Sequence, residues 1–130
     1  MKKKILVIIA DYYKDISNDL LKSTLNNLNK KHYFIKILKV PGVFEIPVTI
    51  SRNINKYNGF IALGCVIKGQ TPHFDFISQS VTDAIMKLSI SSKKPIGNGI
   101  ITCLNKKQAI ARGKKGLEAS EAVKVVLTNK

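Results

Sequence analysis

Apolar residues recur along this chain in two alternating patterns, one of short buried runs and one of helical spacing. Residues 4–10 (KILVIIA) and 60–67 are almost continuously apolar, which is typical of strands covered on both faces. Residues 33–40 (YFIKILKV) and 96–102 carry the β-branched residues and bounding turn signals of strands. These four stretches therefore predict four β-strands.

The segments between the strands show the spacing of amphipathic helices. The first runs from Ile16 to Leu28, with Asp15 as its expected N-cap. Pro47 falls in the first turn of the second, where proline is tolerated. Thus the sequence predicts helices at 16–28, 45–55, 72–90, 108–112 and 117–127.

Strands that alternate with helices, over connections too long for hairpins, predict a parallel sheet with helices on both faces. The expected fold is α/β: a three-layer αβα sandwich, flavodoxin-like, with a four-stranded parallel sheet. Residues 1–130 are expected to form a single domain. Because right-handed crossovers bring the carboxyl ends of the strands to one edge, we expect the ligand site there.

The net charge of +14 raises the question of a nucleic-acid partner or an anionic surface. The lysines are scattered along the sequence, mostly at the ends of elements, and aromatic residues are not interleaved with them as in RNA-binding motifs. We therefore expect no nucleic-acid partner and interpret the charge as a solvated face with a general attraction for anionic substrates. Salt-dependent RNA binding through the lysines at 93–94 and 106–107 is the last-ranked alternative.

The sequence carries few features that indicate a cellular compartment. The N-terminal stretch MKKKILVIIADYY resembles a signal peptide, but its short apolar core runs into Asp11 without a small-residue cleavage site, which favours a strand. No apolar run approaches the roughly 20 residues of a membrane span, so we expect no membrane partner. Cys65 and Cys103 lie in apolar runs without metal-ligand spacing, which indicates reduced core thiols in a cytoplasmic protein, although spacing alone leaves a disulfide open.

The run LGCVIKGQTPHFDF, residues 63–76, carries the strongest chemical signal. An apolar strand ends in a Lys-Gly turn, and a Thr-Pro-His step opens a helix. Such a turn aims backbone N–H groups and the positive end of the helix dipole at one point, which suits a phosphate. His73 stands beside that point with an imidazole that can titrate near neutral pH. Thr71 as N-cap with Pro72 at N1 is the purely structural alternative, but it leaves His73 unexplained.

Other segments are expected to meet at the same edge. Tyr12, after the first strand, offers a ring on which a planar heterocycle could stack, although a half-buried aromatic at a strand end is an equally good interpretation. The turn PGVFEIP, residues 41–47, brings backbone amides and Glu45 to the start of the second helix. Glu45 could instead complement the helix dipole there. His32 is expected to end a polar turn.

These motifs resemble the 6,7-dimethyl-8-ribityllumazine synthase family. PGVFEIP (41–47), LGCVIKGQTPHFDF (63–76), PIGNGIIT (95–102), QAIAR (108–112) and KKGLEA (114–119) occur in the family's order and approximate spacing, over residues 6–126. The resemblance implies a transferase that condenses 5-amino-6-(D-ribitylamino)uracil with 3,4-dihydroxy-2-butanone 4-phosphate and releases phosphate and water, the penultimate step of riboflavin synthesis. It also implies no metal and no organic cofactor.

The resemblance assigns roles by position. His73 matches the histidine of proton transfer, Tyr12 the aromatic that stacks on the pyrimidine, and Arg112 the phosphate-binding arginine. The remaining substrate-binding positions are, in chain order, Val43, Phe44, Glu45, Cys65, Val66, Ile67, Gln70, Thr71, Asn98 and Lys115.

Two departures from the family pattern stand out. Asn98 occupies a position where many members carry an aromatic residue, so that stacking there is weakened or replaced by hydrogen bonding. The linker after Arg112 is short, so that Lys114 competes with Lys115 for the substrate contact. The resemblance further implies a homopentamer with active sites between subunits, with decamers or 60-subunit shells as further assemblies and riboflavin synthase as a candidate partner.

A flavodoxin-like nucleotide- or flavin-binding module without catalytic activity is the alternative from another functional class. It would use the same sheet edge and would need no site between subunits.

Overall fold

The computed structural model describes residues 2–129, and its centre is a sheet of four parallel strands in the order β2-β1-β3-β4. The strands are β1 (Lys3–Ala10), β2 (Tyr33–Val40), β3 (Gly59–Ile67) and β4 (Ile96–Cys103). Each differs from its predicted range by at most one residue at either end. The predicted α/β, flavodoxin-like fold is confirmed.

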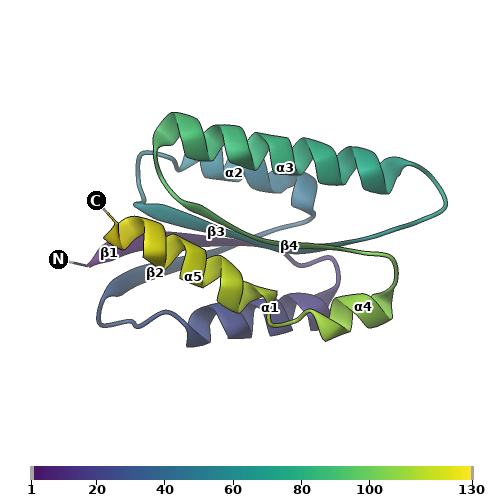
Figure 1. Ribbon diagram of the computed structural model, residues 1–130, viewed down its shortest axis with the longest axis horizontal. Coiled ribbons are helices and arrows are strands. Elements are labelled where there is room, and N and C mark those ends of the chain that lie inside the picture. The colour runs from purple at the N-terminus through teal and green to yellow at the C-terminus, as the bar shows by residue number, and fades with distance from the viewer. Residues whose placement is uncertain (1, 130) are drawn as a thin grey trace.

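Helices cover both faces of this sheet (Figure 1). One layer holds α2 (Ile46–Arg52) and α3 (His73–Ser92); the other holds α1 (Lys14–Asn26), α4 (Lys106–Ala111) and α5 (Lys115–Thr128). A short 3-10 helix, η1 (Val43–Glu45), leads into α2. The result is the expected three-layer arrangement.

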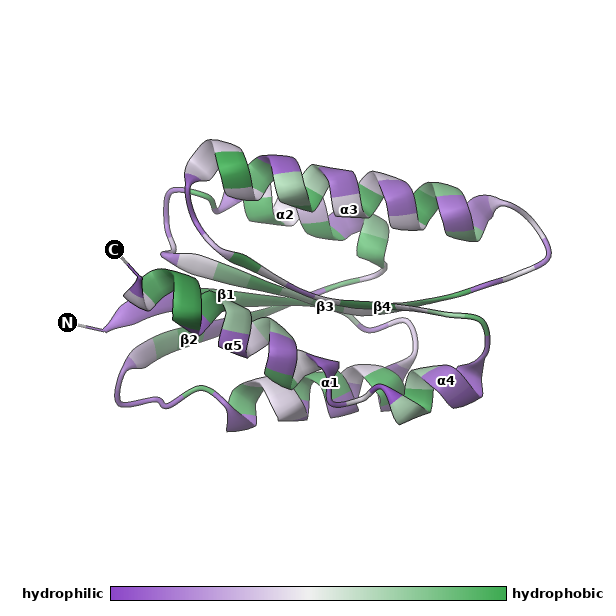
Figure 2. Ribbon diagram, in the orientation of Figure 1, coloured by the Kyte–Doolittle hydropathy of each residue, from purple (hydrophilic) through white to green (hydrophobic). Residues whose placement is uncertain are grey.

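Two apolar clusters, one on each face of the sheet, form the core. Odd-numbered residues of β1, such as Ile5 and Val7, pack with α1 and α5, and even-numbered ones, such as Leu6 and Ile8, pack with α2 and α3. All four side chains are fully buried. Figure 2 shows β1 and β3 in hydrophobic colours along most of their length. A central strand buried on both faces explains the unbroken apolar run in the sequence.

Glycine allows α5 to approach β4 closely. A Cβ on Gly97 would meet the backbone of Ala119 in α5, and a Cβ on Gly99 would lie 3.3 Å from the Ala119 Cβ. The two glycines that weaken the strand pattern in the sequence therefore serve helix packing.

The start of α1 corrects one prediction. Tyr13, not Asp15, is the N-cap residue, and its side chain makes no capping hydrogen bond. The Ser17 N–H donates to the Tyr13 carbonyl oxygen at 2.9 Å, so the helix begins before Asp15, which lies in the first turn. The helix also ends at Asn26, although Leu28 beyond it is still buried in the core.

Other helix boundaries shift for local reasons. The single helix expected over residues 45–55 divides into η1 and the shorter α2, which keeps Pro47 in its first turn. Pro72, not Thr71, is the N-cap residue of α3, so proline does not occupy N1. The last two helices begin two residues earlier than expected; Asn105 caps α4 by accepting from the Gln108 N–H at 2.9 Å.

Charge is unevenly distributed between the two ends of the sheet. The segments that lead into the amino ends of β2, β3 and β4 carry exposed lysines, including Lys30, Lys31, Lys56 and Lys93. These segments contain no Asp or Glu; they are residues 27–33, 53–58 and 92–95. We call this end of the molecule the lysine rim; Asp11 and Glu45 lie at the opposite end, where the strands terminate.

Candidate active site

A cavity of about 660 Å³ lies at the carboxyl ends of β1, β2 and β3. We call it the aromatic cavity. It is lined by residues that follow or end these strands and by the first turn of α3: Tyr12, Tyr13, Gly42, Val43, Phe44, Cys65, Val66, Ile67, His73 and Ile77.

Aromatic rings dominate one side of this cavity. The side chains of Tyr12 and Phe44 are 75% and 62% exposed, so both rings are available to a ligand. Tyr13 is half-buried and packs against the core, with its ring edge-on to that of Tyr12 at a centroid distance of 4.9 Å. An exposed ring held by a packed neighbour suits stacking of a planar heterocycle.

His73 lies on the rim of the aromatic cavity as the first residue of α3. Its backbone N–H lies 3.4 Å from the Thr71 hydroxyl, which accepts from it. The imidazole is exposed, so it can exchange protons with a bound ligand or with water. In the preceding loop, the N–H groups of Gln70 and Thr71 donate to no backbone carbonyl among residues 2–129. They therefore remain available to an anion.

Cys65 forms part of the inner wall and is a neutral thiol. Burial, and then the neighbouring Cys103, raise the pKa of Cys65 to about 12. Both cysteines are buried and free, as expected for core thiols. A thiol with such a pKa is a poor nucleophile at neutral pH, so Cys65 serves as an apolar surface. Burial, followed by Tyr12 and Cys65, also raises the pKa of Tyr13.

A second cavity, of about 760 Å³, lies beside β4 and the start of α5. We call it the cationic cavity because Arg112, Lys114 and Lys115 line it. Arg112 Nη1 donates to the Thr102 carbonyl oxygen at 3.0 Å. Lys115 forms an ion pair with Glu118 at 3.5 Å, whereas the described part of the chain provides no ion pair for Lys114.

The candidate residues therefore fall into two groups within one chain. The aromatic cavity contains Tyr12, Val43, Phe44, Cys65, Val66, Ile67 and His73, and the cationic cavity contains Asn98, Arg112 and Lys115. The two cavities share no lining residue.

Three further candidates line neither cavity: Glu45, Gln70 and Thr71. Glu45 is nevertheless close to the aromatic cavity, because a Cβ on Gly42 would lie 3.2 Å from its carboxylate. Asn98 is turned back on its own strand, where its Oδ1 accepts from the Ile100 N–H at 3.0 Å.

Tyr13 and Ile77 line the aromatic cavity although the motifs did not select them. Ile77 follows His73 by one helical turn, so the spacing could have identified it. Tyr13 follows Tyr12 directly, but the sequence does not reveal that both rings face one cavity. Lys114, a competitor of Lys115 in the sequence, lines the cationic cavity together with it.

Within residues 2–129, no group of three or more His, Cys, Asp or Glu side chains is placed to hold a metal ion. No helix in that range is long and apolar enough to cross a membrane.

Comparison with known proteins identifies relatives along nearly the whole chain. The family model described as 6,7-dimethyl-8-ribityllumazine synthase matches residues 2–129. Proteins of that name from Bartonella bacilliformis and Bartonella tribocorum are 40% and 39% identical, over 86% and 94% of this chain and 76% and 87% of their own lengths. The protein of that name from Vesicomyosocius okutanii is 38% identical over 97% of this chain and 84% of its own length.

Proposed function

Because the chain belongs to the 6,7-dimethyl-8-ribityllumazine synthase family, we propose that its aromatic cavity holds the pyrimidine substrate and its cationic cavity the phosphate. The protein is a transferase that condenses 5-amino-6-(D-ribitylamino)uracil with 3,4-dihydroxy-2-butanone 4-phosphate. The observation that carries the assignment is the meeting of exposed rings and His73 in one cavity.

The pyrimidine ring stacks on Tyr12 in this proposal. The exposed Tyr12 ring, held edge-on by Tyr13, supports that role. The polar ribityl chain needs hydrogen-bonding groups, and the turn containing Val43, Phe44 and Glu45 offers backbone amides and a carboxylate beside the cavity. Cys65, Val66 and Ile67 form the wall behind the ring.

The phosphate is bound by the Gln70–Thr71 turn and by Arg112 and Lys115. The planar guanidinium of Arg112 matches phosphate geometry, and its remaining N–H groups can reach a ligand. Within one chain, Arg112 and His73 lie in different cavities. We therefore propose that a neighbouring copy supplies the cationic cavity to each site, in a homopentamer.

Exposed apolar side chains support an assembly. Phe76, Met86 and Ile90 on α3 are 59–69% exposed, and Val48 on α2 is 57% exposed. Large exposed apolar residues gathered on one helical layer are typical of an interface. We further propose that the enzyme works in the cytoplasm.

The chemistry consists mainly of proton transfers between reactive partners. The substrate amine adds to the ketone to form an imine with loss of water, phosphate leaves, and the ring closes with loss of a second water. Each step moves a proton, and the exposed imidazole of His73 on the aromatic cavity is placed to accept and to donate one. Since the amine and the ketone react once brought together, positioning supplies much of the acceleration.

A fluorescence assay tests this function. Purified protein is mixed with both substrates, and the fluorescent lumazine product is followed over time. Product formation above the spontaneous rate is expected; its absence would favour a ligand-binding module without catalysis. Sedimentation measurements on the same sample distinguish a pentamer from larger assemblies by mass.

A further inference from the structure

Ser23 lies on α1 where this helix meets the start of α5. Its hydroxyl oxygen is 3.0 Å from the Gly113 carbonyl oxygen and 3.0 Å from the Leu20 carbonyl oxygen of its own helix. A serine hydroxyl carries one proton, so the two carbonyls share it. The bond to Gly113 joins positions 90 residues apart and is a tertiary contact.

The same part of α1 leaves no room for side chains at two glycines that flank the cations. A Cβ on Gly113 would lie 2.9 Å from the Asp19 Cβ. A Cβ on Gly116 would lie 2.6 Å from Ser23 Oγ and would also meet the Leu20 carbonyl oxygen. The backbone on both sides of Lys114 and Lys115 is therefore seated on α1.

Residues 112–115 carry the three positive charges of the cationic cavity. Arg112 directly precedes Gly113, and its guanidinium contacts β4 through the Thr102 carbonyl oxygen and, at 3.7 Å, Cys103 Sγ. The segment is thus held by β4 through a side chain and by α1 through its backbone. The Ser23 hydroxyl makes the hydrogen bond on the α1 side.

We propose that Ser23 is a positioning residue for the cations of the cationic cavity. By fixing the Gly113 carbonyl, it orders the backbone between Arg112 and Lys114 before a phosphate arrives. A segment that is ordered only on binding loses affinity to the entropy of that ordering. This inference rests on the proposed phosphate role of the cationic cavity; its kinetic part rests on the proposed catalytic activity as well.

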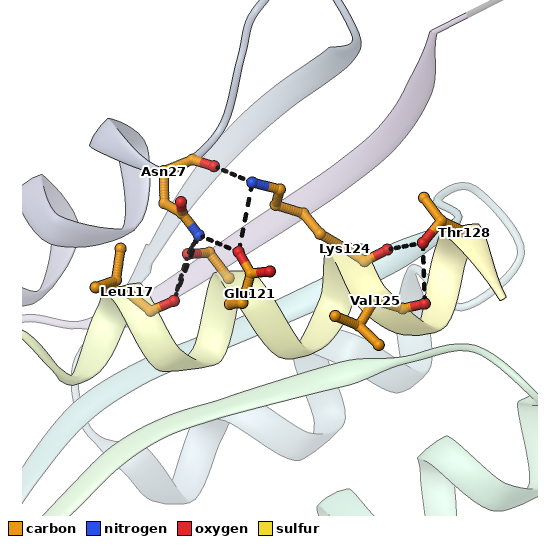
Figure 3. Close-up of polar contacts among 7 residues, drawn as sticks. Asn27, Leu117, Glu121, Lys124, Val125 and Thr128 are labelled. Atoms are coloured by element: carbon orange, nitrogen blue, oxygen red, sulfur yellow. Dashed lines mark hydrogen bonds and ion pairs between the residues drawn. The ribbon is translucent and has the colours of Figure 1, made fainter.

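The chain offers a matched control at the end of the same helix. The Asn27 side-chain amide donates to the Glu121 carboxylate at 3.1 Å (Figure 3) and to the Ser120 hydroxyl at 3.0 Å; both residues belong to α5. Asn27 therefore also ties α1 to α5; its amide lies 3.5 Å from the Leu117 carbonyl oxygen as well, but it makes no hydrogen bond to residues 112–115. Its removal should cost stability without disturbing residues 112–115.

The test compares Ser23→Ala, Ser23→Thr and Asn27→Ala in the full-length protein. Titration calorimetry with inorganic phosphate measures anion affinity, and steady-state fluorescence measures kcat and the KM of each substrate. Ser23→Ala should weaken phosphate binding about fivefold, equivalent to about 1 kcal/mol at 1.4 kcal/mol per tenfold. It should raise the KM of the butanone phosphate by a similar factor and leave kcat and the pyrimidine KM within twofold. Ser23→Thr, which keeps the hydroxyl, should bind phosphate as the unmodified protein does.

Asn27→Ala should lower the urea midpoint and leave phosphate affinity within twofold. The proposal is wrong if Ser23→Ala also leaves phosphate affinity within twofold of that of the unmodified protein. It is also wrong if Asn27→Ala weakens phosphate binding as much as Ser23→Ala does, or if the unmodified protein binds no phosphate. Should no variant form lumazine while Ser23→Ala alone loses phosphate affinity, the proposed function fails and the role of Ser23 stands.

Discussion

Replacing Gly97 with alanine tests how closely α5 is fitted to the sheet. A Cβ at this position would lie 2.8 Å from the carbonyl carbon of Ala119 and 3.0 Å from Val123 Cγ2, and it would also meet the Ala119 carbonyl oxygen. Because two of these atoms belong to the helix backbone, no side-chain rotation can relieve the clash. Either α5 must move away from β4, or the strand must bend.

The magnitude follows from two opposing effects. Overpacking of a filled core costs typically 1–3 kcal/mol of stability. The Gly97→Ala substitution should cost about 3 kcal/mol, at the upper end of this range, because the new Cβ meets helix backbone and lies beside the fully buried Val123. Alanine also restricts the unfolded chain, which contributes roughly 0.5–1 kcal/mol in the other direction. The net loss is about 2 kcal/mol. With an unfolding entropy of about 2.1 cal/mol/K per residue over 130 residues, the midpoint temperature of thermal unfolding should fall by about 7 °C.

Urea and thermal unfolding, followed by circular dichroism, measure this loss. Both proteins are compared at one concentration, since assembly makes apparent stability depend on it. Gly69→Ala is the matched control, because no atom lies within 4 Å of a Cβ placed there. If Gly97→Ala costs no more than Gly69→Ala, the contact between α5 and β4 does not limit stability and the reasoning is refuted.

Three further predictions concern residues of the two cavities. His73→Ala should lower kcat about 10²-fold or less, because positioning remains intact; a loss of many more decades in the fluorescence assay would contradict this. Arg112→Lys should raise the KM of the phosphorylated substrate about tenfold, since an ammonium cannot bind phosphate in the bidentate manner of a guanidinium; an unchanged KM would remove Arg112 from the site. With its pKa near 12, Cys65 should react with iodoacetamide at pH 8 roughly 10³-fold more slowly than free cysteine, and the reaction rate should rise as the pH approaches 12. Mass spectrometry of labelled peptides measures this rate. Rapid labelling at pH 8 would contradict the prediction, because it would show an accessible thiolate.

A pH series gives a fifth prediction. Hydrogen bonding from Asn27, and then the charge of Lys124, lower the pKa of Glu121. The resulting stabilisation is present above the unfolded pKa of about 4.3 and is lost as the pH falls through the lower folded value. Glu121→Gln should therefore flatten the decline of the urea midpoint below pH 5; an unchanged decline would show that this carboxylate does not contribute.

Strands were easier to predict from this sequence than helix ends. The buried runs of β1 and β3 admit one interpretation, because a strand covered on both faces must be apolar throughout. Helix starts depend on which carbonyl the first N–H groups reach. Asp15 has the chemistry of an N-cap, but packing of Tyr13 into the core starts α1 before it.

The candidate site was predictable as chemistry and only partly as geometry. Parallel topology implied that Tyr12, Phe44 and His73 would meet at one sheet edge, and they line one cavity. The sequence could not show that Arg112 would lie in another cavity, because that depends on the path of the chain after β4. Contacts such as Ser23 with Gly113 leave no sequence signal, since neither residue belongs to a recognisable motif.

The lysine rim has a consequence for assembly. In a ring whose symmetry axis ran along the strands, equivalent residues of all copies would lie at the same height, and Lys30, Lys56 and Lys93 of every subunit would join into one cationic annulus. Two rings brought together through these annuli would repel each other over the Debye length of about 8 Å at physiological salt. Stacking of rings in that orientation would thus be favoured by high ionic strength or by a layer of multivalent anions between them.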